Sequence, residues 1–173
     1  INLDCEMALV TRALAEAGVC FLMAPRHHAA MRHVGPVRAD LGVRTIFNLL
    51  GPLANPALVQ RIMVGVFDRR WCRPFAKALA QLGTTHAWVV HGSDGLDEVT
   101  TTGPTFVAAL ADGQISEFTI QPADIGLNQV DLGDLLGGTP AQNAAHLRAL
   151  LNGATGPYRD IVIFNAAAAL VGG

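Results

Sequence analysis

Short apolar runs alternate with segments of helical periodicity along this chain, and that alternation limits the possible folds more than any other feature. Arg61–Phe67 and His86–Val90 have the pattern of buried strands, and Trp71–Leu82 between them has the pattern of a helix closed by Gly83. Strands that are joined through a helix pair in parallel. The pattern therefore predicts an α/β fold, with a mostly parallel central sheet flanked by helices.

Further segments extend this pattern on both sides. Asp112-Gly113 stands between two β-like runs within Thr105–Gln121 and predicts a β-hairpin excursion. Val19–Met23 is a short apolar run with the pattern of a buried strand. The remaining helices are expected at Met7–Ala17, with Asp4 as N-cap and Gly18 as terminator, at Pro140–Leu151 and at Tyr158–Leu170.

Composition excludes several classes of protein. Of the 173 residues, 51% are apolar and 15% are charged, a balance too apolar for a disordered chain. The longest stretches without a charged residue, Thr45–Gln60 and Ala78–Ser93, are only 16 residues long. A membrane span needs about 20 apolar residues. Three cysteines without CxxC spacing favour reduced thiols. We therefore expect a cytoplasmic protein with no membrane partner.

The charged residues give no sign of nucleic-acid binding. Twelve basic and 14 acidic residues leave a net charge of −2, and the basic residues are scattered. Eleven of the twelve are arginine, which binds carboxylates and phosphates in bidentate fashion. We expect no nucleic-acid partner, and single arginines become candidates for ligand binding.

The most informative candidate site is the glycine-rich segment Gly92–Glu98. It directly follows a predicted parallel strand, where open α/β sheets bind their ligands. Its adjacent carboxylates, Asp97 and Glu98, can converge on one Mg²⁺, which prefers one or two carboxylates together with waters and substrate phosphates. The alternative is an acidic surface turn in which Asp94 or Asp97 acts as a cap.

A second candidate site lies in the basic segment Arg26–His33 and continues to Arg38. His28 and Arg38 fall on one stripe if the segment is helical, and together they would suit an organic carboxylate beside an aromatic ring. The alternative is a solvated basic face. Zinc is not expected, because no cysteine or carboxylate stands at ligand spacing from the histidines.

Together these motifs resemble the anthranilate phosphoribosyltransferase family. The resemblance covers nearly the whole chain, and the long block from Leu41 to Pro56 is highly specific. It implies the catalytic-domain fold that nucleoside phosphorylases share with these transferases. The matching segments are Phe21–Pro25, His28–Met31, Val37–Arg38, Leu41–Pro56, Gly95–Val99, Asn143–Ala144 and Asn165–Leu170.

The resemblance implies an activity and a set of site residues. The family transfers phosphoribosyl from phosphoribosyl pyrophosphate (PRPP) to anthranilate in tryptophan biosynthesis, with Mg²⁺ as cofactor. By this resemblance Asp97 and Glu98 bind Mg²⁺, Arg38 holds the anthranilate carboxylate, and His28 and Pro52 line the anthranilate channel.

Two departures from the family pattern shape the expectation. Ala29 replaces the usual proline between His28 and Ala30, which would loosen the backbone near the channel. The family's Gly-Thr-Gly-Gly-Asp phosphate loop, its Lys-His-Gly segment and its helical N-terminal domain have no counterpart in this sequence. We expect residues 1–173 to be a single α/β catalytic-domain fragment without the C-terminal end, inactive alone, whose parent protein is a homodimer.

Two other functions remain open from the sequence. A pyrimidine nucleoside phosphorylase would share the fold, but Gly95–Glu98 and the Leu41–Pro56 block point away from it. A non-catalytic relative that binds nucleic acid is the other alternative, against which the charge of −2 and the single lysine argue. Consumption of thymidine and phosphate would identify the first, and salt-dependent DNA binding the second.

Overall fold

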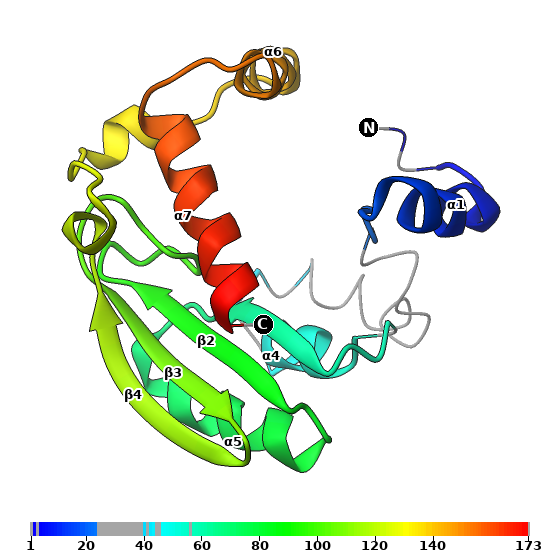
Figure 1. Cartoon of the computed structure of the whole chain (residues 1–173), viewed down its shortest axis with the longest axis vertical. Coiled ribbons are helices and arrows are strands. Elements are labelled where there is room, and N and C mark those ends of the chain that lie inside the picture. Colours follow the sequence, from blue (N-terminus) through cyan, green and yellow to red (C-terminus); the bar gives the residue numbers. More distant parts are fainter. Residues whose placement is uncertain are drawn as a thin grey trace. The chain divides into compact units, whose positions relative to one another are not determined.

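A computed structural model describes residues 2, 4–23, 40, 42–43, 46–55 and 57–172 of the chain. The chain divides into two compact units, Ile1–Leu58 and Val59–Gly173. Figure 1 shows the elements of both units along the sequence.

The first unit contains two described helices. Helix α1 spans Met7–Ala17 and ends at Gly18, whose left-handed backbone (φ 73°) directs its N–H to the carbonyl of Leu14. Its N-cap is Glu6, so the prediction of Asp4 was wrong: Asp4 stands two residues before the cap position. Helix α4 spans Phe47–Leu53.

The predicted strand at Val19–Met23 was also wrong. These residues belong to no strand within the described part of the chain. A strand is stable only beside a partner that completes its hydrogen-bond ladder, and apolar composition alone does not supply one. Val19 and Phe21 are accordingly exposed.

The second unit is built on one four-stranded sheet in the order β1-β2-β3-β4. β1 pairs with β2 in parallel, whereas β2–β3 and β3–β4 are antiparallel. The strands are β1 Arg61–Gly65, β2 His86–Gly92, β3 Thr105–Ala111 and β4 Gln114–Ile120.

The α/β class is confirmed, but the described sheet is mixed rather than mostly parallel. No helix lies in the connection between β2 and β3, so β3 returns antiparallel beside β2. The hairpin at Asp112-Gly113 is confirmed, and both turn residues have positive φ (48° and 75°). The hairpin forms the second half of the central sheet and is not an excursion from it.

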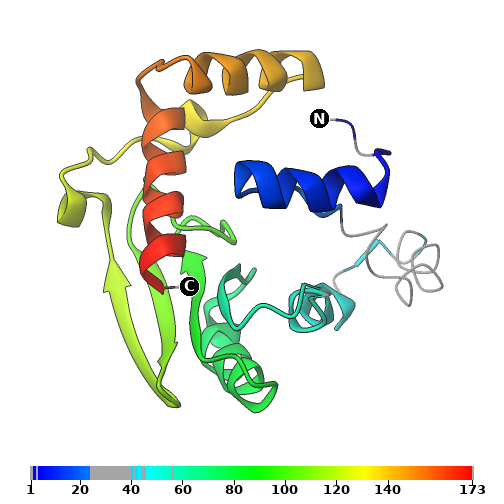
Figure 2. The same ribbon diagram turned by 45° about the vertical axis from the view of Figure 1, so that its right-hand side comes forward.

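Two helices cover the sheet. Helix α5, Cys72–Gln81, packs against β2, β3 and β4, and helix α7, Pro157–Gly172, packs against β1 and β2. Figures 1 and 2 show them on different sides of the sheet. Because side chains alternate along a strand, Val90 joins the α7 side, in one cluster with Phe164, whereas Val89 faces the α5 side.

The other elements are short or peripheral. Helix α6 spans Pro140–Leu151 and begins with a capping box between Thr139 and Gln142. The 3-10 helices are η2 Arg69–Trp71, η3 Pro122–Ile125 and η4 Leu132–Leu135. Among the described residues, no helix is long and apolar enough to cross a membrane.

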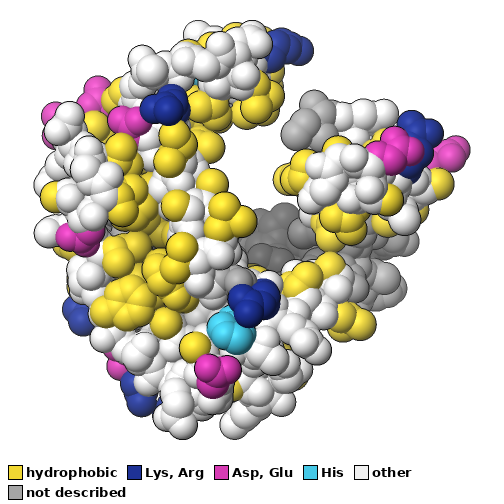
Figure 3. Space-filling view, viewed as in Figure 1, with side chains coloured by type: hydrophobic (Ala, Val, Ile, Leu, Met, Phe, Trp, Pro, Cys, Tyr) yellow, Lys and Arg dark blue, Asp and Glu magenta, His cyan; other side chains and the backbone are white. Residues whose placement is uncertain are grey.

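The outer side of α7 is apolar. Figure 3 shows hydrophobic side chains gathered over α7 and the neighbouring part of the sheet. Val162, Ile163, Leu170 and Val171 are among the exposed apolar residues of this helix. Surface of this kind is typical of regions that contact another segment or chain.

Candidate functional site

The candidate site is the loop that follows β2, at the edge where the carboxyl ends of parallel β1 and β2 meet. The loop closes on itself, because the Gly92 N–H donates to the Leu96 carbonyl at 2.8 Å. Gly95 stands at the turn with φ 94°, a conformation that side chains disfavour. This edge is where open α/β sheets bind ligands.

Asp94 holds the loop together. Its Oδ1 accepts from the Leu96 N–H at 3.0 Å, and its Oδ2 accepts from the hydroxyls of Thr100 and Thr102, each at 2.6 Å. Burial alone would raise the pKa of Asp94, but the hydrogen bonds from Thr100, Thr102 and Leu96 outweigh it and lower that pKa. The sequence offered Asp94 or Asp97 as the residue that caps this turn, and in the structure Asp94 makes the capping hydrogen bonds.

Asp97 and Glu98 differ from Asp94 in being exposed residues. No hydrogen bond or ion pair within the described part of the chain involves either side chain. Partial burial raises the pKa of Glu98, and the neighbouring charge of Asp97 raises it further. Two adjacent negative charges with nothing described to offset them suit a cation.

The donor set fits Mg²⁺ better than a metal that needs a full protein cage. Among the described residues, no group of three or more His, Cys, Asp or Glu side chains could hold a metal ion. Two carboxylates completed by water and phosphate oxygens are a common Mg²⁺ arrangement, whereas zinc takes three or four protein ligands.

Gly65 at the end of β1 lies against the backbone of the loop. A Cβ at this position would overlap the backbone carbonyl of Asp97. The absence of a side chain is therefore what allows the loop to lie directly on the strand. The sequence offered one signal for this contact, a glycine inside an apolar strand run.

Asn165 on α7 holds the other side of the loop. Its Oδ1 accepts from the Val99 N–H at 2.9 Å, and its Nδ2 donates to the Val99 carbonyl at 2.6 Å. Val99 itself is fully buried and packs in one cluster with Phe164 and Ala168 of α7. Sequence reasoning included Asn165 only in a family-like segment, although a single amide in an apolar helix signals a hydrogen-bonding role.

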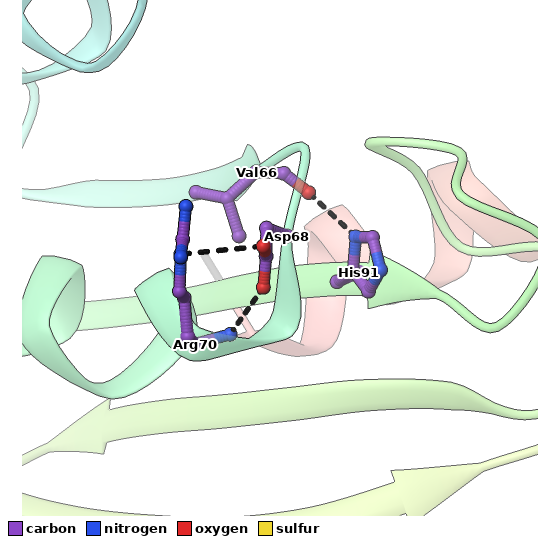
Figure 4. Close-up of polar contacts among 4 residues, drawn as sticks. All are labelled: Val66, Asp68, Arg70 and His91. Atoms are coloured by element: carbon purple, nitrogen blue, oxygen red, sulfur yellow. Dashed lines mark hydrogen bonds and ion pairs between the residues drawn. The ribbon is translucent and has the colours of Figure 1, made fainter. Parts of the chain in front are cut away.

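Polar contacts also order the neighbouring strand ends (Figure 4). The Nδ1 of His91 lies 2.8 Å from the Val66 carbonyl, which can only accept, so Nδ1 carries the hydrogen. Asp68 accepts from the Arg70 backbone N–H at 3.0 Å and forms an ion pair with its Nε at 3.2 Å. These contacts fix the direction in which the chain leaves β1.

The other predicted site residues belong to the first unit. His28, Ala29 and Arg38 lie outside the described residues. Pro52 lies half-buried within α4, in the first unit, whereas Asp97 and Glu98 belong to the second.

A family comparison places the chain among known proteins. The model of a family described as "Glycosyl transferase family, a/b domain" matches residues 1–173. The chain belongs to this family. The α/β class predicted from the alternation of strands and helices agrees with that description.

Relatives within the family are anthranilate phosphoribosyltransferases, which confirms the resemblance drawn from the sequence. The enzyme of Phenylobacterium zucineum is 62% identical over 171 residues, which cover 99% of this chain and 50% of the relative. The chain thus spans about half the length of the curated relatives that it matches.

Solved structures agree with the sequence comparison. The anthranilate phosphoribosyltransferase of Thermus thermophilus superposes with a TM-score of 0.90 at 43% identity, covering 99% of this chain and 51% of that one. The Saccharomyces cerevisiae enzyme in complex with PRPP and Mg gives a TM-score of 0.83 at 30% identity, over 96% and 48% of the two chains. The yeast enzyme has also been solved in complex with 4-fluoroanthranilate.

Proposed function

We propose that this chain supplies the α/β domain of an anthranilate phosphoribosyltransferase, which transfers phosphoribosyl from PRPP to anthranilate. The observation that carries the proposal is the Asp97–Glu98 pair, exposed and without a described partner at the carboxyl ends of β1 and β2. The relatives' names and the yeast complex with PRPP and Mg support the same reading.

In this proposal Asp97 and Glu98 hold Mg²⁺ through their carboxylates. Mg²⁺ held by these two residues would supply positive charge that offsets the negative charge of the pyrophosphate leaving group. Asp94, Gly65 and Asn165 fix the loop, so the backbone that bears both carboxylates is in place before a ligand binds.

Anthranilate recognition is assigned to the segment around Arg38. Its guanidinium would bind the anthranilate carboxylate through two parallel hydrogen bonds, leaving the amine directed at C1. His28 and Pro52 would line the path of the aromatic ring. The new bond would join the amine nitrogen to C1 as the bond from C1 to the pyrophosphate oxygen breaks, and the nitrogen would release one proton.

We further propose that the remaining half of the relatives' length supplies what this sequence lacks. No Gly-Thr-Gly-Gly-Asp segment occurs in residues 1–173, so a phosphate loop of that kind would come from elsewhere. The chain alone is therefore expected to be inactive. The whole protein would be a cytoplasmic homodimer that binds no nucleic acid.

A chimera tests the proposal. The parts of the Phenylobacterium zucineum enzyme that this chain does not cover would be joined to it, and formation of phosphoribosyl-anthranilate would be followed with Mg²⁺ present. We expect activity in the chimera and none in the chain alone.

Site variants of the chimera test the residue assignments. Asp97→Asn with Glu98→Gln should lower kcat/KM by at least about 100-fold, the range for losing a preorganised charge contact. Arg38→Ala should mainly raise KM for anthranilate.

The matched control is Glu117→Gln, which removes a carboxylate of β4 that is paired with Arg73 of α5. Its effect should be small. Full activity in the double variant would contradict the metal assignment, and consumption of thymidine and phosphate in place of anthranilate would favour a nucleoside phosphorylase.

A further inference from the structure

We propose that Asn165 of α7 is a positioning residue for the Asp97–Glu98 pair and acts through the backbone of Val99. Its role toward a cation rests on the proposed function, whereas its role in ordering the loop does not. Asn165 and Val99 are 66 residues apart in sequence, and two hydrogen bonds join them.

The two bonds restrain the peptide groups on both sides of Val99. The Val99 N–H belongs to the peptide that links it to Glu98, and the Val99 carbonyl belongs to the next peptide along the chain. A peptide group is planar and moves as one unit, so holding the first one restricts ψ of Glu98 once the peptide that precedes Glu98 is also restrained. The direction of the Glu98 side chain from the backbone is thereby limited.

Glu98 is restrained on its other side as well. The carbonyl of Asp97 belongs to the peptide that precedes Glu98, and Gly65 lies against that carbonyl. Glu98 therefore stands between two restrained peptides, one resting on β1 and the other held by α7. Glu98 is an exposed residue although its backbone is restrained.

Asn165 is itself ordered by its own helix. Its Nδ2 also donates to the Ile161 carbonyl at 2.9 Å, one turn earlier on α7. Phe164 and Ala168 of the same helix are buried in one cluster with Val99. Packing and hydrogen bonding thus join the same residue of the loop to the same turn of the helix, which leaves little freedom for either.

No other natural side chain of this size gives the same pair of bonds. An amide offers an acceptor to the Val99 N–H and a donor to the Val99 carbonyl at once. A carboxylate keeps the acceptor but loses the donor, and a leucine loses both. Asn165→Asp and Asn165→Leu therefore remove one or both bonds with little change in volume.

The experiment uses the isotopically labelled 173-residue chain and those two variants, with Asn152→Asp at the exposed end of α6 as the matched control. Amide hydrogen exchange without metal is the first measurement. We expect exchange at Val99 to rise about tenfold relative to Val107 in Asn165→Leu, which loses the acceptor of the Val99 N–H, and to rise less in Asn165→Asp, which keeps it. Equal acceleration at Val99 and Val107 would mean general destabilisation and would overturn the proposal.

The second measurement is a titration with Mg²⁺, alone and with pyrophosphate, followed at the amides of Asp97 and Glu98. The midpoint should rise about tenfold in the Asn165 variants and stay unchanged in Asn152→Asp. Equal midpoints in wild type and variants would overturn the role toward the cation. A wild-type chain that gives no response would contradict the metal site of the proposed function, whereas local acceleration at Val99 would still support Asn165 as the residue that orders the loop.

Discussion

Gly65 and Asp97 are in direct backbone contact: the Cα of the glycine lies so close to the Asp97 carbonyl that a Cβ would overlap it. Gly65 ends the parallel strand β1, and Asp97 is the first residue of the carboxylate pair. The backbone of the loop therefore lies directly on the backbone of the strand, with no side chain between them.

Gly65→Ala should therefore displace the loop. The obstacle is backbone, which cannot rotate away, so we expect a loss of about 2–3 kcal/mol in unfolding free energy and weaker Mg²⁺ binding. Urea unfolding and Mg²⁺ titration would measure both. Gly133→Ala is the control, because a Cβ there meets nothing within 4 Å. If both variants are equally stable, the close contact is relieved at no cost and does not restrain the loop.

Asp94→Asn should destabilise the protein at neutral pH. The amide nitrogen would face two threonine hydroxyls that now donate to Oδ2, and a loss of about 1–2 kcal/mol is expected. Because hydrogen bonding lowers the pKa of Asp94 in the folded state, its ionised form stabilises the fold above the ordinary carboxyl range.

The difference between wild type and Asp94→Asn should then shrink as the pH falls below about 4, through the folded-state pKa. Unfolding curves at pH 7 and at acid pH would show this. Asp112→Asn in the exposed hairpin turn is the control and should change little, since asparagine suits positive φ. A constant difference at every pH would assign the effect to packing.

Glu98→Gln, unlike Asp94→Asn, should stabilise the protein and raise its melting temperature in metal-free buffer at pH 7. Burial and the charge of Asp97 raise the pKa of Glu98, so its ionised form opposes folding. The gain in melting temperature should be present at pH values above the raised pKa of Glu98. It should disappear as the pH falls below the ordinary glutamate pKa of about 4.3. Calorimetry would measure it. Glu117→Gln should give no gain, because Glu117 is paired with Arg73 at 2.8 Å.

Cys72 should resist alkylation. Burial raises the pKa of its thiol to about 11, with the Arg69 charge acting weakly in the other direction. At pH 8 iodoacetamide should modify the half-buried Cys20 well before Cys72, as peptide mass spectrometry would show. Rapid labelling of Cys72 in the folded protein would mean that α5 opens readily from the sheet.

Local patterns were enough to predict most of the second unit. The spacing of apolar residues gave α6 at the observed bounds and the hairpin at Asp112-Gly113, because these elements depend on neighbouring residues. The direction of β3 was missed, since it depends on the route of the β2–β3 connection. The strand predicted at Val19–Met23 was wrong, because pairing requires a partner that no local pattern specifies.

The candidate site was predicted in part. Adjacent acidic residues after a strand marked the loop, and the family resemblance singled out Asp97 and Glu98. The sequence could not separate Asp94 from these two, because only the fold brings Thr100 and Thr102 to its carboxylate. Asn165 was not assigned a role, since its partner is 66 residues away.

The loop cannot be transplanted by itself. Its restraints come from Gly65, from Asp94 within the loop and from Asn165, three positions spread over a hundred residues of chain. A synthetic peptide of residues 91–102 would carry both carboxylates but neither the strand nor the helix that fixes them. Grafting this cation site onto another protein would therefore require a strand, a loop and a helix in the same arrangement. The site is thus expected to be inherited only together with the whole domain.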